Sequence, residues 1–309
     1  MIRIASVGEC MIELRHRSES ELELGFGGDT LNTAVYLARL LQARDAEVAY
    51  VTALGTDAYS ARMLDFWHDE GIATQRVARL VDRLPGLYTI QTDARGERTF
   101  TYWRGQSAAR RALADERGEA LLRDLPGIDL LYASGITLSI LDAPQRGTLL
   151  EIAEAVRSAG GKVAFDTNFR PVAWPDLHVA RHAFDEMLRR SDIALPTLED
   201  DRKLFEVEQV TTCAERIHAL GVPEVVVKLG ELGASVSLDG SVTRIPPEAV
   251  PVVVDSTAAG DSFNAGYLAA RLTGSPPEAA AALGNRLAAI VIQHRGAVIA
   301  RDAMAALRV

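Results

Sequence analysis

Cysteine is scarce in this chain of 309 residues, which has two, Cys10 and Cys213, far apart in the sequence. Two isolated cysteines form neither a disulfide framework nor a metal cluster, so we expect buried apolar residues in a reducing cytoplasm. The histidines lack metal-binding spacing too, apart from His178 and His182, which have no adjacent acid of the zinc-protease type. We interpret that pair as surface residues on one helix face.

Positive charge is also in short supply, because 33 lysines and arginines face 42 aspartates and glutamates, a net charge of -9. This balance argues against nucleic acid or an anionic membrane as the main partner, so an anionic ligand must be held by local positive charge. No apolar run approaches the roughly 20 residues that cross a membrane. The N-terminus leads straight into a strand pattern, and we expect a cytoplasmic protein without a leader or membrane anchor.

What the chain does have is a regular alternation of short β-branched runs with longer helical patterns. The expected strands are residues 2–7, 47–52, 130–134, 162–166, 193–195 and 224–229, and the expected helices are 30–41, 59–70, 144–159, 177–190 and 212–220. Such alternation predicts one large α/β domain whose mostly parallel sheet is covered by helices on both faces. Ligands of these sheets collect at the carboxyl ends of the strands.

Two regions, about residues 10–26 and 84–104, break this alternation. Residues 87–91 and 99–103 alternate like strands and are joined by the turn Asp93-Ala94-Arg95-Gly96. We expect a small β-sheet that projects from the main domain. It either closes over the ligand cleft or covers an exposed edge.

A turn of small residues, Ala258-Ala259-Gly260, separates a β-branched run at 252–254 from an apolar-periodic stretch that predicts a helix. Side chains this small let the backbone N–H groups at the helix start meet a phosphate. Asp261, in the first turn of that helix, is then placed to take a proton from a hydroxyl that attacks the phosphate. The alternative is an ordinary strand-to-helix turn with Asp261 as a helix cap.

A second glycine-rich loop, Gly25-Phe26-Gly27-Gly28, opens an amphipathic helix near the N-terminus. Its glycines allow a close backbone approach to a ligand, and Asp29 and Asn32 supply polar groups for hydroxyls. The loop lacks the terminal Gly-Lys-Ser/Thr of a Walker A motif, and the turn after the first strand lacks the G-x-G-x-x-G of a dinucleotide-binding dehydrogenase.

Together, GGDTLNTA and DSTAAGDSFNAG resemble the paired signatures of the ribokinase-like (PfkB) carbohydrate kinases, which phosphorylate a sugar hydroxyl with ATP. The resemblance covers almost the whole chain. It implies a single ribokinase-like Rossmann-type three-layer α/β/α domain over residues 1–309 with a small β-sheet lid, and a homo-oligomer. By resemblance Asp261 is the catalytic base and Ala258, Ala259 and Gly260 form the anion hole. That hole usually begins with glycine, so Ala258 is a departure.

Within the family, the segments GECMIEL, GFGGDTLNT, YVTALGTD, RLPGLY, GERTFTYWR and DTNFRPVAW most resemble kinases of 2-keto-3-deoxygluconate, phosphorylated on its 6-hydroxyl. This substrate carries a carboxylate, which a guanidinium grips through two parallel hydrogen bonds. The resemblance implies substrate contacts from the lid and the core, namely Gly28, Asp29, Asn32, Tyr88, Tyr102, Arg104, Arg170 and Asp261. Taken singly, the tyrosines and arginines also fit an exposed surface.

The nucleotide side of the site rests on the same resemblance. It places the turn flanked by Gly230 and Gly233 beside ATP, Asn168 near the phosphates and Asn285 near the adenine or ribose. Lys228 is a candidate phosphate contact, with a solvated strand-end lysine as the alternative. The family's N-x-x-E pattern falls on residues 197–200 with both ends changed, which leaves open whether Glu199 or Asp200 orders Mg²⁺. A monovalent cation also stays open.

Two rival functions remain at this stage. One is a kinase of the same fold acting on fructose, ribose or the galactonate epimer. The other is a binding or regulatory protein that lost catalysis, although an intact Asp261 and small-residue turn argue against it.

Overall fold

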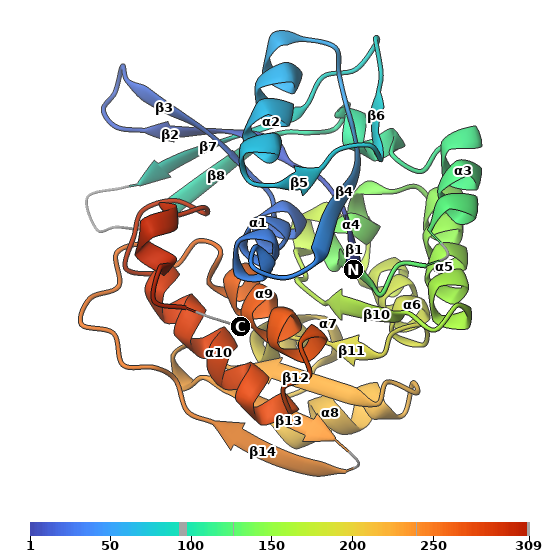
Figure 1. Cartoon of the computed structure of the whole chain (residues 1–309), viewed down its shortest axis with the longest axis vertical. Helices are drawn as coiled ribbons and strands as arrows, with labels where there is room; N and C mark the ends of the chain where they lie inside the picture. The colour runs from blue at the N-terminus through green and yellow to red at the C-terminus, as the bar shows by residue number, and fades with distance from the viewer. Residues whose placement is uncertain (93–97, 126, 239, 308–309) are drawn as a thin grey trace.

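The computed structural model describes residues 1–92, 98–125, 127–238 and 240–307, and its main body is one large, mostly parallel sheet (Figure 1). Its strands follow the order β14-β13-β12-β11-β10-β9-β1-β4-β5, with β6 also paired to β4 and only β13 and β14 antiparallel to their neighbours. They are β1 (Ile2–Val7), β4 (Ala46–Leu54), β5 (Ile72–Ala73), β6 (Val77–Arg79), β9 (Leu130–Ser134), β10 (Lys162–Asp166), β11 (Ile193–Ala194), β12 (Glu224–Lys228), β13 (Ala234–Leu238) and β14 (Ser241–Ile245). All six expected strands form.

Helices cover both faces of this sheet because its strands are apolar on both sides. In β12, Val226 joins one buried cluster while Val225 and Val227 join the other. The first cluster is completed by α1 (Asp29–Leu41), α2 (Ala58–Asp69), α9 (Ala259–Leu272) and α10 (Pro277–Val291). The second is completed by α3 (Glu116–Asp124), α4 (Gly135–Ile140), α5 (Ala143–Ser158), α6 (Leu177–Leu188), α7 (Leu198–Phe205) and α8 (Val210–His218). The predicted three layers and all five expected helices are therefore confirmed.

A separate four-stranded sheet, in the order β3-β2-β7-β8, projects from one end of the main body (Figure 1). It consists of β2 (Met11–His16), β3 (Leu22–Gly27), β7 (Gly86–Thr92) and β8 (Arg98–Trp103). These are the two segments that interrupt the α/β alternation in the sequence. Strands β7 and β8 pair antiparallel as expected of a hairpin, and the predicted turn at 93–96 lies outside the described residues.

The start of α1 is pressed against the end of β1. A Cβ atom on Gly28 would lie 2.1 Å from the carbonyl oxygen of Glu9, so only glycine fits there. Ser6 in β1 also donates from its hydroxyl to the carbonyl of Thr30 at 2.9 Å. This close packing fixes the glycine-rich loop at the carboxyl edge of the main sheet.

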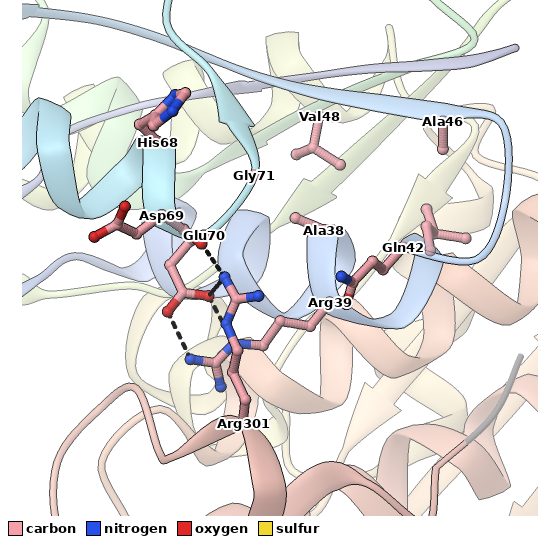
Figure 2. Close-up of a pocket in the computed structure, with 11 residues that line it drawn as sticks. Ala38, Arg39, Gln42, Ala46, Val48, His68, Asp69, Glu70, Gly71 and Arg301 are labelled. Atoms are coloured by element: carbon pink, nitrogen blue, oxygen red, sulfur yellow. Dashed lines mark hydrogen bonds and ion pairs between the residues drawn. The ribbon is translucent and has the colours of Figure 1, made fainter.

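Ion pairs and hydrogen bonds connect the C-terminal segment to α1. Figure 2 shows these residues around a pocket of about 290 Å³. Arg39 on α1 binds both carboxylate oxygens of Glu70 at 2.8 Å and the carbonyl of Ile299 at 2.7 Å. Arg301, in the 3-10 turn Arg301–Met304, binds the same carboxylate at 3.0 Å. Residues from three distant parts of the chain are thus tied together near the amino ends of β4 and β5. No described helix is long and apolar enough to span a membrane.

Candidate active site

A cleft of about 1090 Å³ lies between the carboxyl ends of the main-sheet strands and the projecting sheet. This volume is sufficient for more than one small ligand. Of the site residues expected from the sequence, it brings together Gly28, Asp29, Asn32, Tyr88, Tyr102, Arg104, Asn168, Arg170, Lys228, Ala258, Ala259, Gly260 and Asp261. The cleft therefore brings together residues that are more than 200 positions apart in the sequence.

Asp261 lies in the first turn of α9 and faces α1. Its Oδ2 accepts a hydrogen bond from Nδ2 of Asn32 at 2.8 Å, and its carbonyl accepts one from the hydroxyl of Thr33 at 3.1 Å. The N-cap of α9 is Ala258, and no side chain caps the helix. The alternative reading of Asp261 as a cap is therefore wrong.

Burial is the largest cause that raises the pKa of Asp261 to about 7; the nearby charges of Asp29 and Asp166 contribute to this rise, while Asn32 and Lys228 oppose it. Burial also raises the pKa of Asp29. A general base works best when its pKa lies near the working pH, because it is then both ionised and basic. The environment of Asp261 has this property.

The small-residue turn before Asp261 is a cradle of backbone donors. Within the described residues, the amides of Ala258 and Gly260 have no acceptor in the protein, whereas that of Ala259 points to the carbonyl of Ser256 at 3.3 Å. A Cβ atom on Gly260 would have only Nζ of Lys228 within 4 Å, at 3.6 Å. These amides at a helix N-terminus fit an anion such as a phosphate.

Two backbone features of this turn could not be read from the sequence. Ala258 adopts a left-handed conformation with φ of 59°, which alanine disfavours and glycine accepts. The β-branched run before it forms no strand, and Val252, Val253 and Val254 are 62%, 57% and 49% exposed. The turn is thus reached from a loop and not from a strand of the sheet.

Asp166, at the end of β10, organises the floor of the cleft, and the sequence analysis did not single it out. Its Oδ1 accepts from Nζ of Lys228 at 2.9 Å, and its Oδ2 accepts from Nδ2 of Asn264 on α9 at 2.7 Å. Lys228 is 7% exposed, so the solvated alternative for this lysine is wrong. The network joins β10, β12 and the helix that carries the cradle. A polar residue at the end of a buried strand is the signal that could have identified it.

Asn168 follows β10 and is bonded to the first signature through Asp29. Its Nδ2 donates to Oδ2 of Asp29 at 2.7 Å, and its backbone has a positive φ of 24°. Its side chain is therefore engaged with the loop expected to bind the sugar.

The projecting sheet contributes two tyrosines with different exposures. Tyr88 is 7% exposed, and its hydroxyl donates to the carboxylate of Glu13. Tyr102 is 47% exposed, packs 5.8 Å from the ring of Tyr88, and lines the cleft. The outward-facing alternative is wrong for Tyr88, while Tyr102 presents an accessible ring to the cleft.

The two arginines expected to hold a carboxylate have different partners. Arg104, directly after β8, forms an ion pair with the buried carboxylate of Glu9, a residue that the sequence analysis did not single out. Arg170, after β10, has a side chain that is 53% exposed and lies 3.5 Å from Oδ1 of Asp200. Arg170 is thus the more accessible of the two cations.

The two acids considered for Mg²⁺ also differ. Glu199 points outward and pairs with Lys203 at 2.7 Å with its side chain 67% exposed, whereas Asp200 is 7% exposed. Both line the cleft. In the part of the chain that the structure describes, no group of three or more His, Cys, Asp or Glu side chains is arranged around a metal. Mg²⁺ keeps several waters and is generally held by one or two carboxylates together with substrate phosphates.

Three residues assigned to the nucleotide lie outside the lining of this cleft. Gly230 and Gly233 flank the 3-10 turn after β12 with φ of 59° and 85°. A Cβ on Gly233 would lie 2.4 Å from the carbonyl of Ile245, so glycine is needed there for packing. Asn285 on α10 donates to the carbonyl of Pro246 at 2.7 Å. Their nucleotide contacts stay a prediction.

The fold and the cleft together define a phosphoryl-transferring enzyme of the carbohydrate kinase class. Residues 1–304 match the pfkB family carbohydrate kinases, and the chain belongs to this family. It is 47% identical over 307 residues to 2-dehydro-3-deoxygluconokinase of Escherichia coli strain K12, covering 98% of this chain and 99% of that one.

Solved structures confirm the ribokinase-like fold. The PfkB protein from Polaromonas sp. JS666 has a TM-score of 0.82 at 27% identity, covering 95% of this chain and 96% of that one. Fructokinase from Vibrio cholerae O395, in its form bound to fructose, ADP and calcium ion, has a TM-score of 0.82 at 23% identity, with 96% and 94% covered.

Proposed function

We propose that this protein is an ATP-dependent kinase of 2-keto-3-deoxy-D-gluconate, also called 2-dehydro-3-deoxygluconate, and phosphorylates its 6-hydroxyl. One observation carries the proposal: the half-buried carboxyl group of Asp261, whose pKa is raised to about 7, shares a cleft with helix amides that have no acceptor among the described residues. The relatives of 42–47% identity over nearly the full length, all named 2-dehydro-3-deoxygluconokinase, support this substrate.

In the proposed reaction Asp261 accepts the proton of the 6-hydroxyl. The hydroxyl oxygen bonds to the γ-phosphorus of ATP, and the bond between that phosphorus and the leaving oxygen of ADP breaks. The amides of Ala258 and Gly260 stabilise the charge on the transferring phosphoryl group. The positive charge of Lys228, on the floor of the cleft, adds to this stabilisation. When bound, Mg²⁺ neutralises phosphate charge, and we assign Asp200 to hold it through water because that carboxylate is buried in the cleft wall.

The rest of the cleft selects and encloses the sugar acid. Arg104 and Arg170 bind the carboxylate, Tyr102 covers the sugar ring, and Asp29 and Asn32 hold hydroxyl groups. The four-stranded sheet acts as a lid that excludes water and so limits wasteful ATP hydrolysis. Pairing of lids between copies of the chain stays a prediction, for which sedimentation velocity is the measurement.

A side-by-side assay of ADP release with four substrates tests the proposal. We expect 2-keto-3-deoxygluconate to give a far higher kcat/KM than fructose or ribose, because neither neutral sugar can engage the arginines. A preference for a neutral sugar would contradict the substrate, and no ADP release with any of them would favour the non-catalytic alternative. The fourth substrate is the galactonate epimer. Its kcat/KM, compared with that of 2-keto-3-deoxygluconate, shows how strongly the enzyme discriminates the configuration of one hydroxyl.

A further inference from the structure

Glu9 is a fully buried carboxylate at the point where the chain leaves the core for the projecting sheet. It lies between β1 and β2, is 2% exposed, and lines the cleft. Its Oε2 accepts a hydrogen bond from Nη2 of Arg104, which follows β8 where the chain returns from that sheet. The pair therefore spans the junction between the main body and the lid.

Both partners of this pair have unused polar atoms. Oε1 of Glu9 and Nε of Arg104 are buried and have no hydrogen-bond partner within the described residues. If Arg104 left Glu9 to bind a ligand, it would strand a buried charge, which is far more costly than keeping the pair. Arg104 must therefore stay bonded to Glu9 while its remaining N–H groups meet a ligand.

The surroundings hold the pair in one orientation. A Cβ on Gly86, at the start of β7, would lie 2.8 Å from Oε1 of Glu9 and 3.2 Å from Cβ of Arg104, so the backbone closes tightly over both. The guanidinium of Arg104 lies 6.0 Å from the centre of the Tyr102 ring. The guanidinium of Arg104 thus lies near the lid residue Tyr102, and its Nη2 is bonded to Glu9 of the main body.

We infer that Glu9 is a positioning residue that fixes the Arg104 guanidinium in the orientation that binds the carboxylate of an acidic sugar. The inference rests on the proposed function for the identity of that sugar. It assigns Glu9 no contact with the substrate, because the role of its carboxylate is to hold Arg104 and its free Oε1 is buried. Selectivity for an acid then depends on a residue near the N-terminus that the ligand never touches.

The test is a double-mutant cycle of Glu9→Gln and Arg104→Leu, with KM and kcat measured for 2-keto-3-deoxygluconate. Glu9→Gln keeps the size of the side chain and removes its charge, so we expect KM to rise about tenfold with kcat within about twofold of wild type. In the Arg104→Leu background, Glu9→Gln should raise KM no further, because its effect passes through the arginine.

A matched control is Glu70→Gln, which also removes the charge of a buried glutamate bonded to an arginine but lies remote from the cleft (Figure 2). It should lower the melting temperature and leave KM unchanged. Independent, additive rises in KM for Glu9→Gln and Arg104→Leu, or a wild-type KM for Glu9→Gln, would overturn the inference. If Glu9→Gln does not fold, Glu9→Asp keeps the charge but shortens its reach, and the same rise in KM is expected.

Failure of the proposed function has a different signature, because wild-type protein would then release no ADP with this sugar acid. Binding of the sugar acid, measured by calorimetry on the same four proteins, still tests the coupling in that case. A double variant that loses no more affinity than Arg104→Leu alone supports it, and additive losses refute it.

Discussion

Nδ2 of Asn32 donates to Oδ2 of Asp261 at 2.8 Å, which joins two residues 229 positions apart in the chain. Asn32 lies in the first turn of α1, in the motif expected to bind the sugar, and Asp261 lies in the first turn of α9, next to the turn expected to bind phosphate. The bond orients the carboxylate and opposes the rise in its pKa. This hydrogen bond therefore couples the segment expected to bind the sugar directly to the expected base.

Replacing Asp261 with Asn should abolish most turnover. A positioned general base contributes roughly 10²- to 10⁴-fold, so we expect kcat to fall within that range. Binding of ATP and of the sugar acid should remain measurable by calorimetry, because the cradle and the arginines are untouched. Asp69→Asn, on an exposed side chain of α2, is the control and should behave as wild type. Near-normal turnover of Asp261→Asn would refute the assignment of the base.

The pH dependence of kcat/KM should show an acidic limb with a midpoint near pH 7, because Asp261 must be ionised and its pKa is about 7. The charge of Asp29 contributes to that raised pKa. Asp29→Asn removes the repulsion, so ionisation becomes easier and the midpoint should move to lower pH even if activity falls. An unchanged or higher midpoint in the variant contradicts this electrostatic coupling.

Asp261→Asn should also stabilise the fold at high pH. The pKa of this carboxyl is raised from 3.8 to about 7 on folding, so its unfolded form ionises first as pH rises. The stability it provides is complete below about pH 4 and is lost as pH rises to 7, whereas Asn has no such dependence. Melting temperatures at pH 5 and pH 8 should show a larger gain for the variant at pH 8. A constant difference between the two pH values would argue against a buried carboxyl of raised pKa.

Ala258→Gly should relieve backbone strain. At φ of 59° alanine is disfavoured relative to glycine by about 1 kcal/mol, part of which the greater freedom of glycine in the unfolded chain offsets. We expect a small increase in melting temperature with turnover preserved, because the amide donor remains. Ala258→Val, whose branched side chain fits this conformation worse, should lower both. Loss of stability in Ala258→Gly would mean that the turn is not strained as described.

Arg170→Leu should weaken the acid substrate far more than a neutral sugar. Arg170 is the more exposed cleft arginine, and its loss removes a charge-assisted contact with the substrate carboxylate. We expect a tenfold or greater rise in KM for the sugar acid, roughly the value of one such bond, with little change in the weak activity on fructose. Equal effects on both substrates would remove Arg170 from carboxylate recognition.

The sequence predicts much of this architecture because its signals are local. Alternating β-branched and helical segments indicate the parallel sheet, and the interruptions at about 10–26 and 84–104 mark the second sheet. The small-residue turn with Asp261 is likewise visible within a few residues. Each of these features depends on neighbours along the chain.

What sequence reasoning missed depends on pairing between distant residues. Glu9 meets Arg104 only because the chain leaves for the projecting sheet and returns from it at the same junction, and Asp166 meets Lys228 because β10 and β12 end at the same edge of the main sheet. The run at 252–254 has strong strand propensity, yet its valines lie exposed in a loop, because propensity yields to tertiary context. Asn285 donates to the carbonyl of Pro246 after β14, a contact that the sequence did not indicate, and its place near the nucleotide stays a prediction.

The location of α9 has a consequence for synthesis on the ribosome. The loop at Gly28 emerges early, but the helix that packs on it begins at Ala259, after more than four-fifths of the 309 residues. A nascent chain that has not yet reached Ala259 therefore carries the Gly28 loop without Asp261 or the small-residue turn. Asn32 and Thr33 gain their bonds to Asp261 only after α9 has emerged.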